Sequence, residues 1–431
     1  MQKQYLGLKM TKKELYGGKY LLAAFTMKPA KGEDFKGLAT EVAAESSTGS
    51  NMRVSTATSF SDDLNARVYK IDPKKKLAYL AYPLEIFDRG GNVQNVMTYI
   101  AGNVYGMSTL SGLRLEDVWF PKKMLDQFDG PSYTLAQMKK YLGIGGRPVL
   151  GTIVKPKIGL KPKEFAQVCY EFWKGGGDFV KFDEPQADQS FAPFVQVIRE
   201  VDKQMRKVVK ETGKNKVFSI NVSAADLDTM IKRAKFVKKT MKPHSYAFLV
   251  DGVTAGWTAV QTIRRLFPNV FLHFHRAGHG AYTRPENAFG YSVPILTKFG
   301  RLAGSSGIHT GTAGIGKMKG DTYEDVTAVH AAFDKKSKGF FYEQDWKGMK
   351  SCAPIASGGL NPTKLAPLIE AFGSTNFITT MGAGCHSHPD GTRAGATALV
   401  QACDAWRKKK TIDEYAKTHP ELAKAIERFR K

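Results

Sequence analysis

The chain has 431 residues, and 42% of them are hydrophobic, which is enough to build the cores of about two domains. Its formal charge is +24, but the basic runs are short and lack interleaved aromatic residues. Solvated surface therefore explains this charge better than a specific nucleic-acid-binding platform. The chain has no apolar run long enough to span a membrane and no secretory h-region, so we expect neither a membrane partner nor export.

Four cysteines stand singly along the chain, at Cys169, Cys352, Cys385 and Cys403. None belongs to a C-x-x-C pair, and this spacing argues against both a disulfide framework and a zinc site. We therefore expect a reduced, cytoplasmic enzyme.

The first part of the chain has the mixed pattern of an α+β unit. Apolar runs predict strands at 20–25 and 76–82, and helical spacing over 34–45 is followed by a turn at 46–49. Turn-forming residues at 128–131 mark a boundary. We predict an N-terminal α+β domain over residues 1–135.

From about residue 147 the pattern changes to short apolar runs that alternate with helical segments. Eight such units in about 250 residues favour a closed (β/α)8 barrel, whereas a doubly wound open sheet normally carries fewer strands. We predict a C-terminal TIM-barrel domain over residues 136–431, ending in a helical tail. The runs lie at 149–154, 179–183, 217–222, 246–251, 270–275, 307–309, 354–357 and 377–381.

Polar side chains follow nearly every one of these runs. In a barrel, the C-terminal ends of all strands open onto the same face, so these groups are expected to converge on one site. A stable core alone does not require that distribution. The residues at the run ends are Lys155, Lys157, Lys181, Asp183, Glu184, Asn221, Asp251, His275, Arg276, His309, Ser357 and Gly382.

The segment 181–184 reads Lys-Phe-Asp-Glu and is the strongest candidate metal site. Side chains alternate along a strand, so Lys181 and Asp183 share one face while Phe182 points outward. Adjacent carboxylates suit Mg²⁺, and a lysine becomes a ligand once its amine adds CO₂ to form a carbamate. Taken alone, the segment is better explained as a salt-bridged Lys-Asp pair at a strand end, because ion pairs outnumber metal sites.

Several ordered motifs resemble those of ribulose-1,5-bisphosphate carboxylase/oxygenase (RuBisCO) large subunits. The resemblance runs from roughly residue 20 to 420 and is closest to the form II and archaeal form II/III branch. No catalytic group is missing from it. The motifs lie at 45–51, 102–106, 151–157, 175–184, 273–279, 309–318, 357–359 and 382–384.

The resemblance implies carboxylation of ribulose 1,5-bisphosphate to 3-phosphoglycerate, with oxygenation by O₂ as a competing reaction. It implies one Mg²⁺ per site, which stabilises an enediolate, and activating CO₂ held as a carbamate on Lys181. It also implies a homodimer, or an oligomer of dimers, with active sites at the subunit interface and without a small subunit. The pathway is either nucleotide (AMP) salvage or a Calvin-type cycle.

The resemblance also assigns roles to individual residues. Lys181, Asp183 and Glu184 bind the metal. Proton transfer falls to Lys155 and His275, and the lid lysine Lys317 pairs with Glu45 of a neighbouring subunit. The substrate is held by Lys157, Ser50, Asn103, Arg276, His309, Ser357, Gly358, Gly359, Gly382 and Ala383.

Two other enzyme classes compete with this interpretation. RuBisCO-like enolases or isomerases of sulfur salvage share the barrel but lose parts of the lid and phosphate apparatus. A P-loop nucleotidase is suggested by residues 311–317, which match G-x-x-x-x-G-K. Met318, however, stands where a P-loop has its Mg²⁺-binding Ser or Thr.

Overall fold

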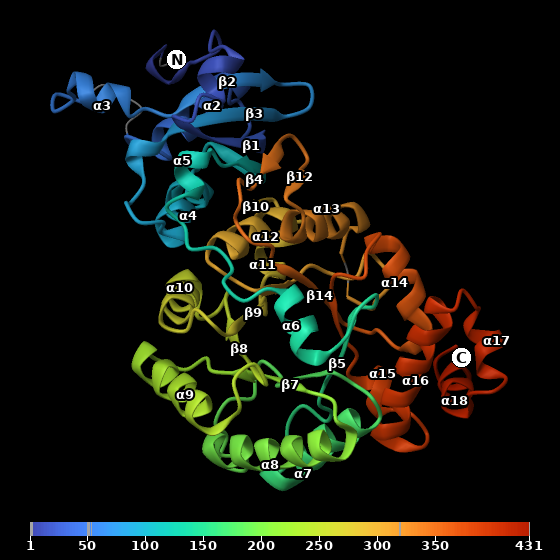
Figure 1. Ribbon diagram of the computed structural model, residues 1–431. Helices are drawn as coiled ribbons and strands as arrows, with labels where there is room; N and C mark the ends of the chain where they lie inside the picture. Colours follow the sequence, from blue (N-terminus) through green and yellow to red (C-terminus); the bar gives the residue numbers. More distant parts are fainter. Residues whose placement is uncertain (1–2, 50–51, 53, 319, 431) are drawn as a thin grey trace. The chain divides into compact units, whose positions relative to one another are not determined.

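The computed structural model describes residues 3–49, 52, 54–318 and 320–430 (Figure 1). The chain forms two compact units, which are described separately. The N-terminal unit contains Met1–Gly130, Gly278–Gly304 and Asp334–Lys350, and the barrel unit contains Pro131–Ala277, Ser305–Phe333 and Ser351–Lys431. The domain bounds expected from the sequence, 1–135 and 136–431, stay a prediction.

The N-terminal unit is built on a five-stranded sheet in the order β10-β4-β1-β3-β2. The central strand β1 pairs antiparallel with both β3 and β4, whereas β10 joins the edge of the sheet parallel to β4. The strands expected at 20–25 and 76–82 are β1 and β3. The bounds are β1 Tyr20–Pro29, β2 Arg67–Asp72, β3 Leu77–Pro83, β4 Leu110–Trp119 and β10 Phe289–Tyr291.

Helix α2 of this unit begins one residue later than expected, because Asp34 is its N-cap. The Asp34 carboxylate accepts a hydrogen bond from the Gly37 N–H at 2.7 Å, which satisfies one of the free donors of the first turn. The helices are α1 Lys12–Leu15, α2 Phe35–Glu45, α3 Ser59–Asp63, α4 Val93–Ala101, α5 Lys122–Leu125, α11 Gly280–Thr283 and α12 Val293–Leu302. Strands β12 Lys336–Lys338 and β13 Glu343–Asp345 form a hairpin.

A buried ion pair ties α12 to the sheet. Lys298 Nζ lies 2.6 Å from Asp117 Oδ1, and neither side chain reaches solvent. The Asp117 carboxylate also accepts the backbone N–H groups of Phe341 and Tyr342. A charge this deeply buried must be paired and hydrogen-bonded, and these contacts explain why two late segments belong to the N-terminal unit.

The barrel unit closes eight parallel strands in the order β11-β14-β15-β5-β6-β7-β8-β9. All eight expected runs are strands, so the predicted barrel is confirmed and the open sheet was the wrong alternative. The bounds are β5 Val149–Ile153, β6 Phe179–Lys181, β7 Val217–Asn221, β8 Tyr246–Asp251, β9 Phe271–His275, β11 Gly307–His309, β14 Ala353–Ser357 and β15 Ile378–Thr380.

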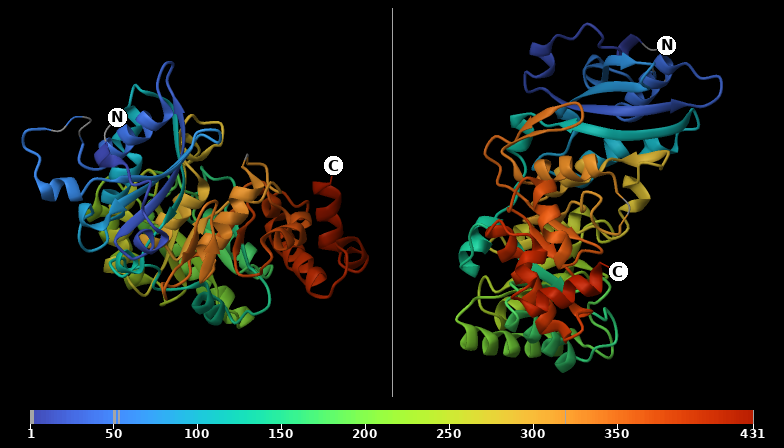
Figure 2. Two further views of the ribbon diagram at one scale, coloured as in Figure 1. Left: turned by 90° about the horizontal axis from the view of Figure 1, so that it is seen from above. Right: turned by 90° about the vertical axis from the view of Figure 1, so that its right-hand side faces the viewer.

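Helices cover the outside of this barrel, as Figure 1 shows for α8, α9 and α10. The C-terminal helices gather in one group, drawn in red in Figure 2, and form the expected helical tail. None of the helices in the described part of the chain is long and apolar enough to cross a membrane. The bounds are α7 Pro162–Lys174, α8 Phe194–Thr212, α9 Leu227–Thr240, α10 Gly256–Leu266, α13 Thr322–Phe333, α14 Leu365–Phe372, α15 Ala383–His386, α16 Gly391–Arg407, α17 Ile412–Ala416 and α18 Pro420–Phe429.

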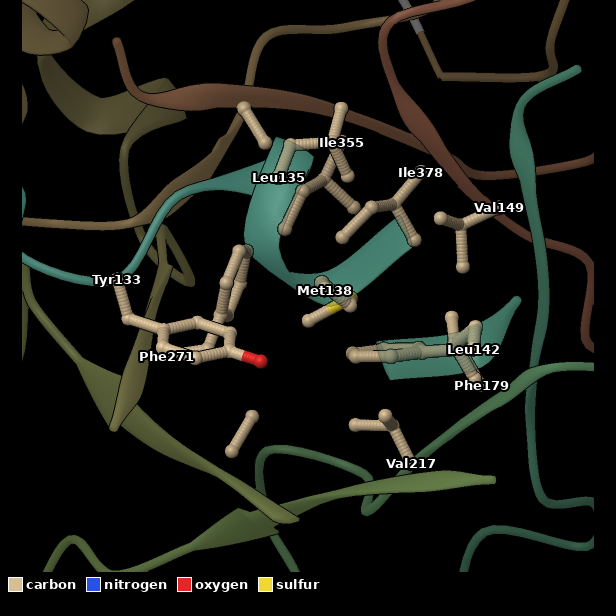
Figure 3. Packing of buried hydrophobic residues seen from close by; sticks show 12 residues of the cluster. Tyr133, Leu135, Met138, Leu142, Val149, Phe179, Val217, Phe271, Ile355 and Ile378 are labelled. Atoms are coloured by element: carbon tan, nitrogen blue, oxygen red, sulfur yellow. The ribbon is translucent and has the colours of Figure 1, made fainter. Parts of the chain in front are cut away.

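One end of the barrel is closed by helix α6, Leu135–Leu142. Its apolar residues Leu135, Met138 and Leu142 pack among the first residues of the strands, including Phe179 and Val217 (Figure 3). This cluster fills the N-terminal end of the barrel. The polar strand ends therefore lie at the opposite, C-terminal end.

Candidate functional site

The residues expected to converge are placed at the C-terminal ends of the barrel strands. Seven of the eight strands end on a polar residue, including β15 at Thr380, and Lys155 follows β5 within two positions. The terminal residues are Lys181 of β6, Asn221 of β7, Asp251 of β8, His275 of β9, His309 of β11 and Ser357 of β14, with Lys155 shortly after β5 and Gly382 after β15.

Lys181 lies at the centre of the candidate metal segment and is completely buried. Its Nζ is 2.8 Å from Glu184 Oε2 and 3.8 Å from Asp183 Oδ1. Lys155 Nζ contacts the other oxygen of Asp183 at 2.5 Å. Burial raises the pKa of Asp183, and the adjacent Glu184 adds to the effect.

The strand-face argument for this segment is confirmed. Phe182 is buried on the outer side of the barrel. Its ring lies 5.1 Å from that of Phe165 on α7 and 5.8 Å from that of Phe218. Strand β6 ends at Lys181, so Asp183 and Glu184 lie on the turn beyond it. The turn brings both carboxylates to the lysine.

This donor set fits a divalent cation if the lysine is carbamylated. In the structure, two lysines face two carboxylates, so the cluster is formally neutral. Converting the Lys181 ammonium to a carbamate changes its charge from +1 to −1, and the cluster then carries two negative charges. A hard oxygen donor set of this charge suits Mg²⁺. Lys181, Asp183 and Glu184 are the residues that could hold it.

His275 lies beside this cluster, between two carboxylates. Its Nδ1 is 2.8 Å from Asp251 Oδ1, and its Nε2 is 3.4 Å from Glu184 Oε2. Burial and the charge of Lys181 lower the pKa of His275. The ring is therefore neutral at neutral pH, and the Asp251 carboxylate favours the tautomer with a proton on Nδ1.

Arg276 is the next residue of the site. The Nη1 of Arg276 is buried and has no hydrogen-bond partner among the described residues. Burial lowers the pKa of Arg276 to about 10, so the guanidinium still carries its charge at neutral pH. A buried cationic donor without a partner is costly, and an anionic ligand would satisfy it.

Two glycine-containing turns lie next to each other on the same face. Gly358 and Gly359 follow β14 and have φ angles of 103° and 74°, and Gly382 caps the short helix that begins at Ala383. A Cβ on Gly384 would lie 2.1 Å from the Leu360 carbonyl oxygen, so the two turns pack closely. Within the described residues, no hydrogen bond uses the N–H of Gly358, Gly359, Gly382 or Ala383.

The loop after β11 is held by its own backbone donors. The N–H groups of Thr312 and Ala313 donate to Asp325 Oδ2 at 3.0 and 2.9 Å, and the Lys317 N–H donates to the Gly358 carbonyl at 2.9 Å. A P-loop needs such donors free for phosphate. This loop therefore does not form the phosphate cradle that its G-x-x-x-x-G-K match suggested. The side chains of Lys157 and Lys317 are exposed.

Two expected site residues lie in the N-terminal unit, where the structure brings them together. Glu45 ends α2, and its Oε1 accepts a hydrogen bond from Asn103 Nδ2 at 3.2 Å. Both side chains are exposed. The third expected residue of this unit, Ser50, lies outside the described residues.

Sequence reasoning expected Asp251 at the site without giving it a role, and it did not single out Ser219. Asp251 holds His275, and Ser219 Oγ lies 2.9 Å from His273 Nδ1. The usable signal was alternation, because Ser219 and Asn221 share a strand face, as do His273 and His275. That signal identifies inward-facing residues but not their partners.

The chain was compared with known protein families. Residues 134–429 match the family described as ribulose bisphosphate carboxylase large chain, catalytic domain. Residues 11–124 match the N-terminal domain of the same large chain.

Individual relatives cover nearly the whole chain. A ribulose bisphosphate carboxylase of Rhodobacter capsulatus is 45% identical over 423 residues, which is 96% of this chain and 92% of the relative. One from Paramagnetospirillum magnetotacticum is 43% identical over 438 residues, 99% of this chain and 95% of the relative.

Solved structures show the same fold. A dimeric archaeal RuBisCO from Hyperthermus butylicus superposes with a TM-score of 0.90 at 35% identity, covering 98% of each chain. An octameric RuBisCO from Pyrococcus horikoshii, solved with sulfate ion, gives 0.89 at 32% identity and covers 98% of this chain and 96% of that one.

Proposed function

We propose that this chain, which belongs to the family of ribulose bisphosphate carboxylase large chains, carboxylates ribulose 1,5-bisphosphate to 3-phosphoglycerate, with oxygenation as the competing reaction. The observation that carries the proposal is the buried Lys181 with Asp183 and Glu184 at the barrel mouth, in a chain that matches the family over both domains. The reaction begins with removal of a proton next to a carbonyl group.

The metal centre is proposed to form on Lys181, Asp183 and Glu184 after CO₂ has added to the lysine. When bound there, Mg²⁺ supplies the positive charge that stabilises an oxyanion beside the reacting carbons. The family is known for this chemistry. The position of Lys181 supports it, because a carbamate there would stand beside the Asp183 and Glu184 carboxylates, and a divalent cation would balance the charge of all three groups.

Proton transfer is assigned to Lys155 and His275, which contact different carboxylates of the cluster. Lys155 contacts Asp183, and His275 contacts Glu184. A neutral imidazole held by Asp251 can accept a proton at Nε2 and return it later in the reaction. Lys157 supports Lys155 from the same loop, and Lys317 is proposed to close over the substrate.

The two phosphate groups of the substrate are assigned to two separate cradles. The Nη1 of Arg276, which has no partner among the described residues, supports the first, together with the Ser357 hydroxyl that His309 holds. The free N–H groups of Gly358, Gly359, Gly382 and Ala383 support the second, because backbone donors at adjacent turns bind anions well. Ser50 and Asn103 are proposed to contribute from a partner subunit.

The assembly is proposed to be a homodimer, or an oligomer of dimers, without a small subunit. The similar archaeal enzymes are described as dimeric and octameric. The paired Glu45 and Asn103 would complete the barrel site of the partner. All four cysteines are unpaired, which supports a cytoplasmic location.

The decisive experiment supplies the purified enzyme with ribulose 1,5-bisphosphate, Mg²⁺ and labelled CO₂. Labelled 3-phosphoglycerate is expected from the native chain and not from Lys181→Ala. The same preparations are offered the diketone phosphate used by sulfur-salvage enolases. The sulfur-salvage alternative would be favoured if the carbamylated enzyme enolises that compound but fixes no CO₂ on ribulose 1,5-bisphosphate.

A further inference from the structure

Four side chains inside the barrel form one continuous chain of hydrogen bonds. Ser219 Oγ lies 2.9 Å from His273 Nδ1, and His273 Nε2 lies 2.9 Å from His309 Nε2. The Nδ1 of His309 is in turn 3.0 Å from Ser357 Oγ. The four residues come from β7, β9, β11 and β14, so the chain crosses the barrel interior and ends at its mouth.

Both histidine rings in this chain are neutral. His273 is fully buried and His309 nearly so. Burial, together with the positive charge of Lys181, lowers the pKa of each ring well below its ordinary value. A neutral imidazole has one N–H and one lone pair, so the contact between the two Nε2 atoms needs one donor and one acceptor. The hydrogen bonds of these four side chains can therefore run in only two directions, with every donor pointing from Ser219 toward Ser357 or every donor pointing the other way. We call each direction a polarity.

Ser219 decides between these polarities. It is fully buried, and His273 is the only partner of its hydroxyl among the described residues. If His273 donated to Ser219, the Ser219 proton would be buried without an acceptor, which is unfavourable. Ser219 therefore donates to His273 Nδ1, and His273 Nε2–H donates to His309 Nε2.

The consequence appears at the other end of the chain. His309 must carry its proton on Nδ1 and donate it to Ser357 Oγ. The hydroxyl proton of Ser357, a residue that is partly exposed, is then free to point into the barrel mouth. With the opposite polarity, Ser357 would donate to His309 and could offer no proton to an anionic ligand.

We propose that Ser219 and His273 are positioning residues that fix the His309 tautomer and turn the Ser357 hydroxyl toward an anionic substrate group. Neither residue touches the substrate. The importance of this arrangement for catalysis rests on the proposed function, but the polarity itself does not. An anion at the mouth would select the same polarity, so the protein holds the site ready before binding.

The test uses NMR of the full chain with ¹⁵N-labelled histidine rings, because protonated and unprotonated ring nitrogens have well-separated shifts. We expect a proton on Nε2 of His273 and on Nδ1 of His309, assigned from His273→Gln and His309→Asn. The opposite pair of tautomers in the native enzyme would overturn the proposal. This readout does not depend on activity, so it stands even if the enzyme fails to fix CO₂.

Ser219→Ala removes the residue that sets the polarity. We expect mixed tautomers at His273 and His309. We also expect the KM for ribulose bisphosphate to rise at least about twofold with little change in kcat. The reason is that the apparent affinity is halved when the binding-competent polarity is populated only half of the time. Ser219→Cys, which keeps a weak donor, should fall between. Ser306→Ala, which removes a buried barrel hydroxyl that has no hydrogen-bond partner among the described residues, is the control and should match the native enzyme. Native tautomers in Ser219→Ala, or an equal KM, would contradict the assignment.

Discussion

At the scale of single residues, the site depends on how each titratable group is held. His275 is useful as a base only while its ring is neutral and its Nε2 faces the reacting centre. The 2.8 Å contact with Asp251 fixes the ring from behind. A histidine without that carboxylate could rotate or take the other tautomer.

Asp251→Asn tests this positioning role. The amide has the same shape, but it no longer favours a proton on Nδ1, so we expect kcat to fall about 10- to 100-fold with a small change in KM. Steady-state carboxylation rates give both values. Asp226→Asn, which alters an exposed helix cap of the same barrel, is the matched control. Native kcat in Asp251→Asn would show that the carboxylate does not orient His275.

At the scale of elements, the loop after β11 is the part suited to move. Its base is held by Asp325 through two backbone hydrogen bonds and its far end by one, from the Lys317 N–H to the Gly358 carbonyl, whereas the Lys317 side chain is exposed. Such a loop can close without breaking the barrel. Its lysine would then reach the intermediate only in the closed state.

Lys317→Ala is expected to separate the two half-reactions. Enolisation, followed as exchange of the substrate C3 proton with solvent deuterium, should remain within about tenfold of the native rate, while carboxylation should fall at least about 100-fold. Lys163→Ala, an exposed lysine on α7, should change neither. An equal loss of both half-reactions would contradict the lid role.

Helix α15 provides a second element-scale prediction. His386 anchors this helix to the barrel, with Nε2 at 2.9 Å from Thr152 Oγ1 and Nδ1 at 3.0 Å from Thr392 Oγ1. Burial lowers the pKa of His386 to about 4 from an ordinary value of 6.5. The unfolded chain therefore takes up this proton first, and the stability that the neutral ring contributes is lost as the pH falls from about 6.5 to about 4.

We expect the melting temperature to fall across that pH range, with at most about 3 kcal/mol attributable to this ring. His386→Asn should be less stable at pH 7 but should lose less between pH 6.5 and 4.5. Thermal melts of both proteins at matched pH values provide the measurement. Parallel curves would mean that His386 does not contribute to the pH dependence.

The elements also show what the sequence can and cannot predict. The eight barrel strands were visible because each is an apolar run with a polar end, and the inward face of Lys181 followed from simple alternation. Strands β2, β4 and β10 were not predicted, and β10 is the hardest to find, because it has three residues and pairs with β4 from about 175 positions further along the chain. Distant pairings such as Glu45 with Asn103, or Ser219 with His273, depend on the closed fold and leave no local pattern.

At the scale of the whole molecule, the active site is proposed to be shared between two copies of the chain. Glu45 and Asn103 belong to the N-terminal unit, whereas the metal segment belongs to the barrel unit. If the sites are shared between subunits, a mixed dimer of two inactive variants contains one intact site.

Mixing Glu45→Ala with Lys181→Ala provides this test. After random reassembly of equal amounts, half of the dimers are mixed and each has one native site of two, so about a quarter of native activity should return. Carboxylation is measured before and after subunit exchange, with each variant alone as the control. No recovery in dimers shown to be mixed would place both residues in the same subunit's site.

The central claim is that Lys181 becomes a carbamate and completes a Mg²⁺ site with Asp183 and Glu184. The most direct measurement is the initial carboxylation rate of enzyme preincubated with CO₂ and Mg²⁺ together, with either alone, or with neither. We predict full initial activity only after preincubation with both, and none in Lys181→Ala under any condition. Full initial activity of enzyme stripped of Mg²⁺ and assayed without it would contradict the account.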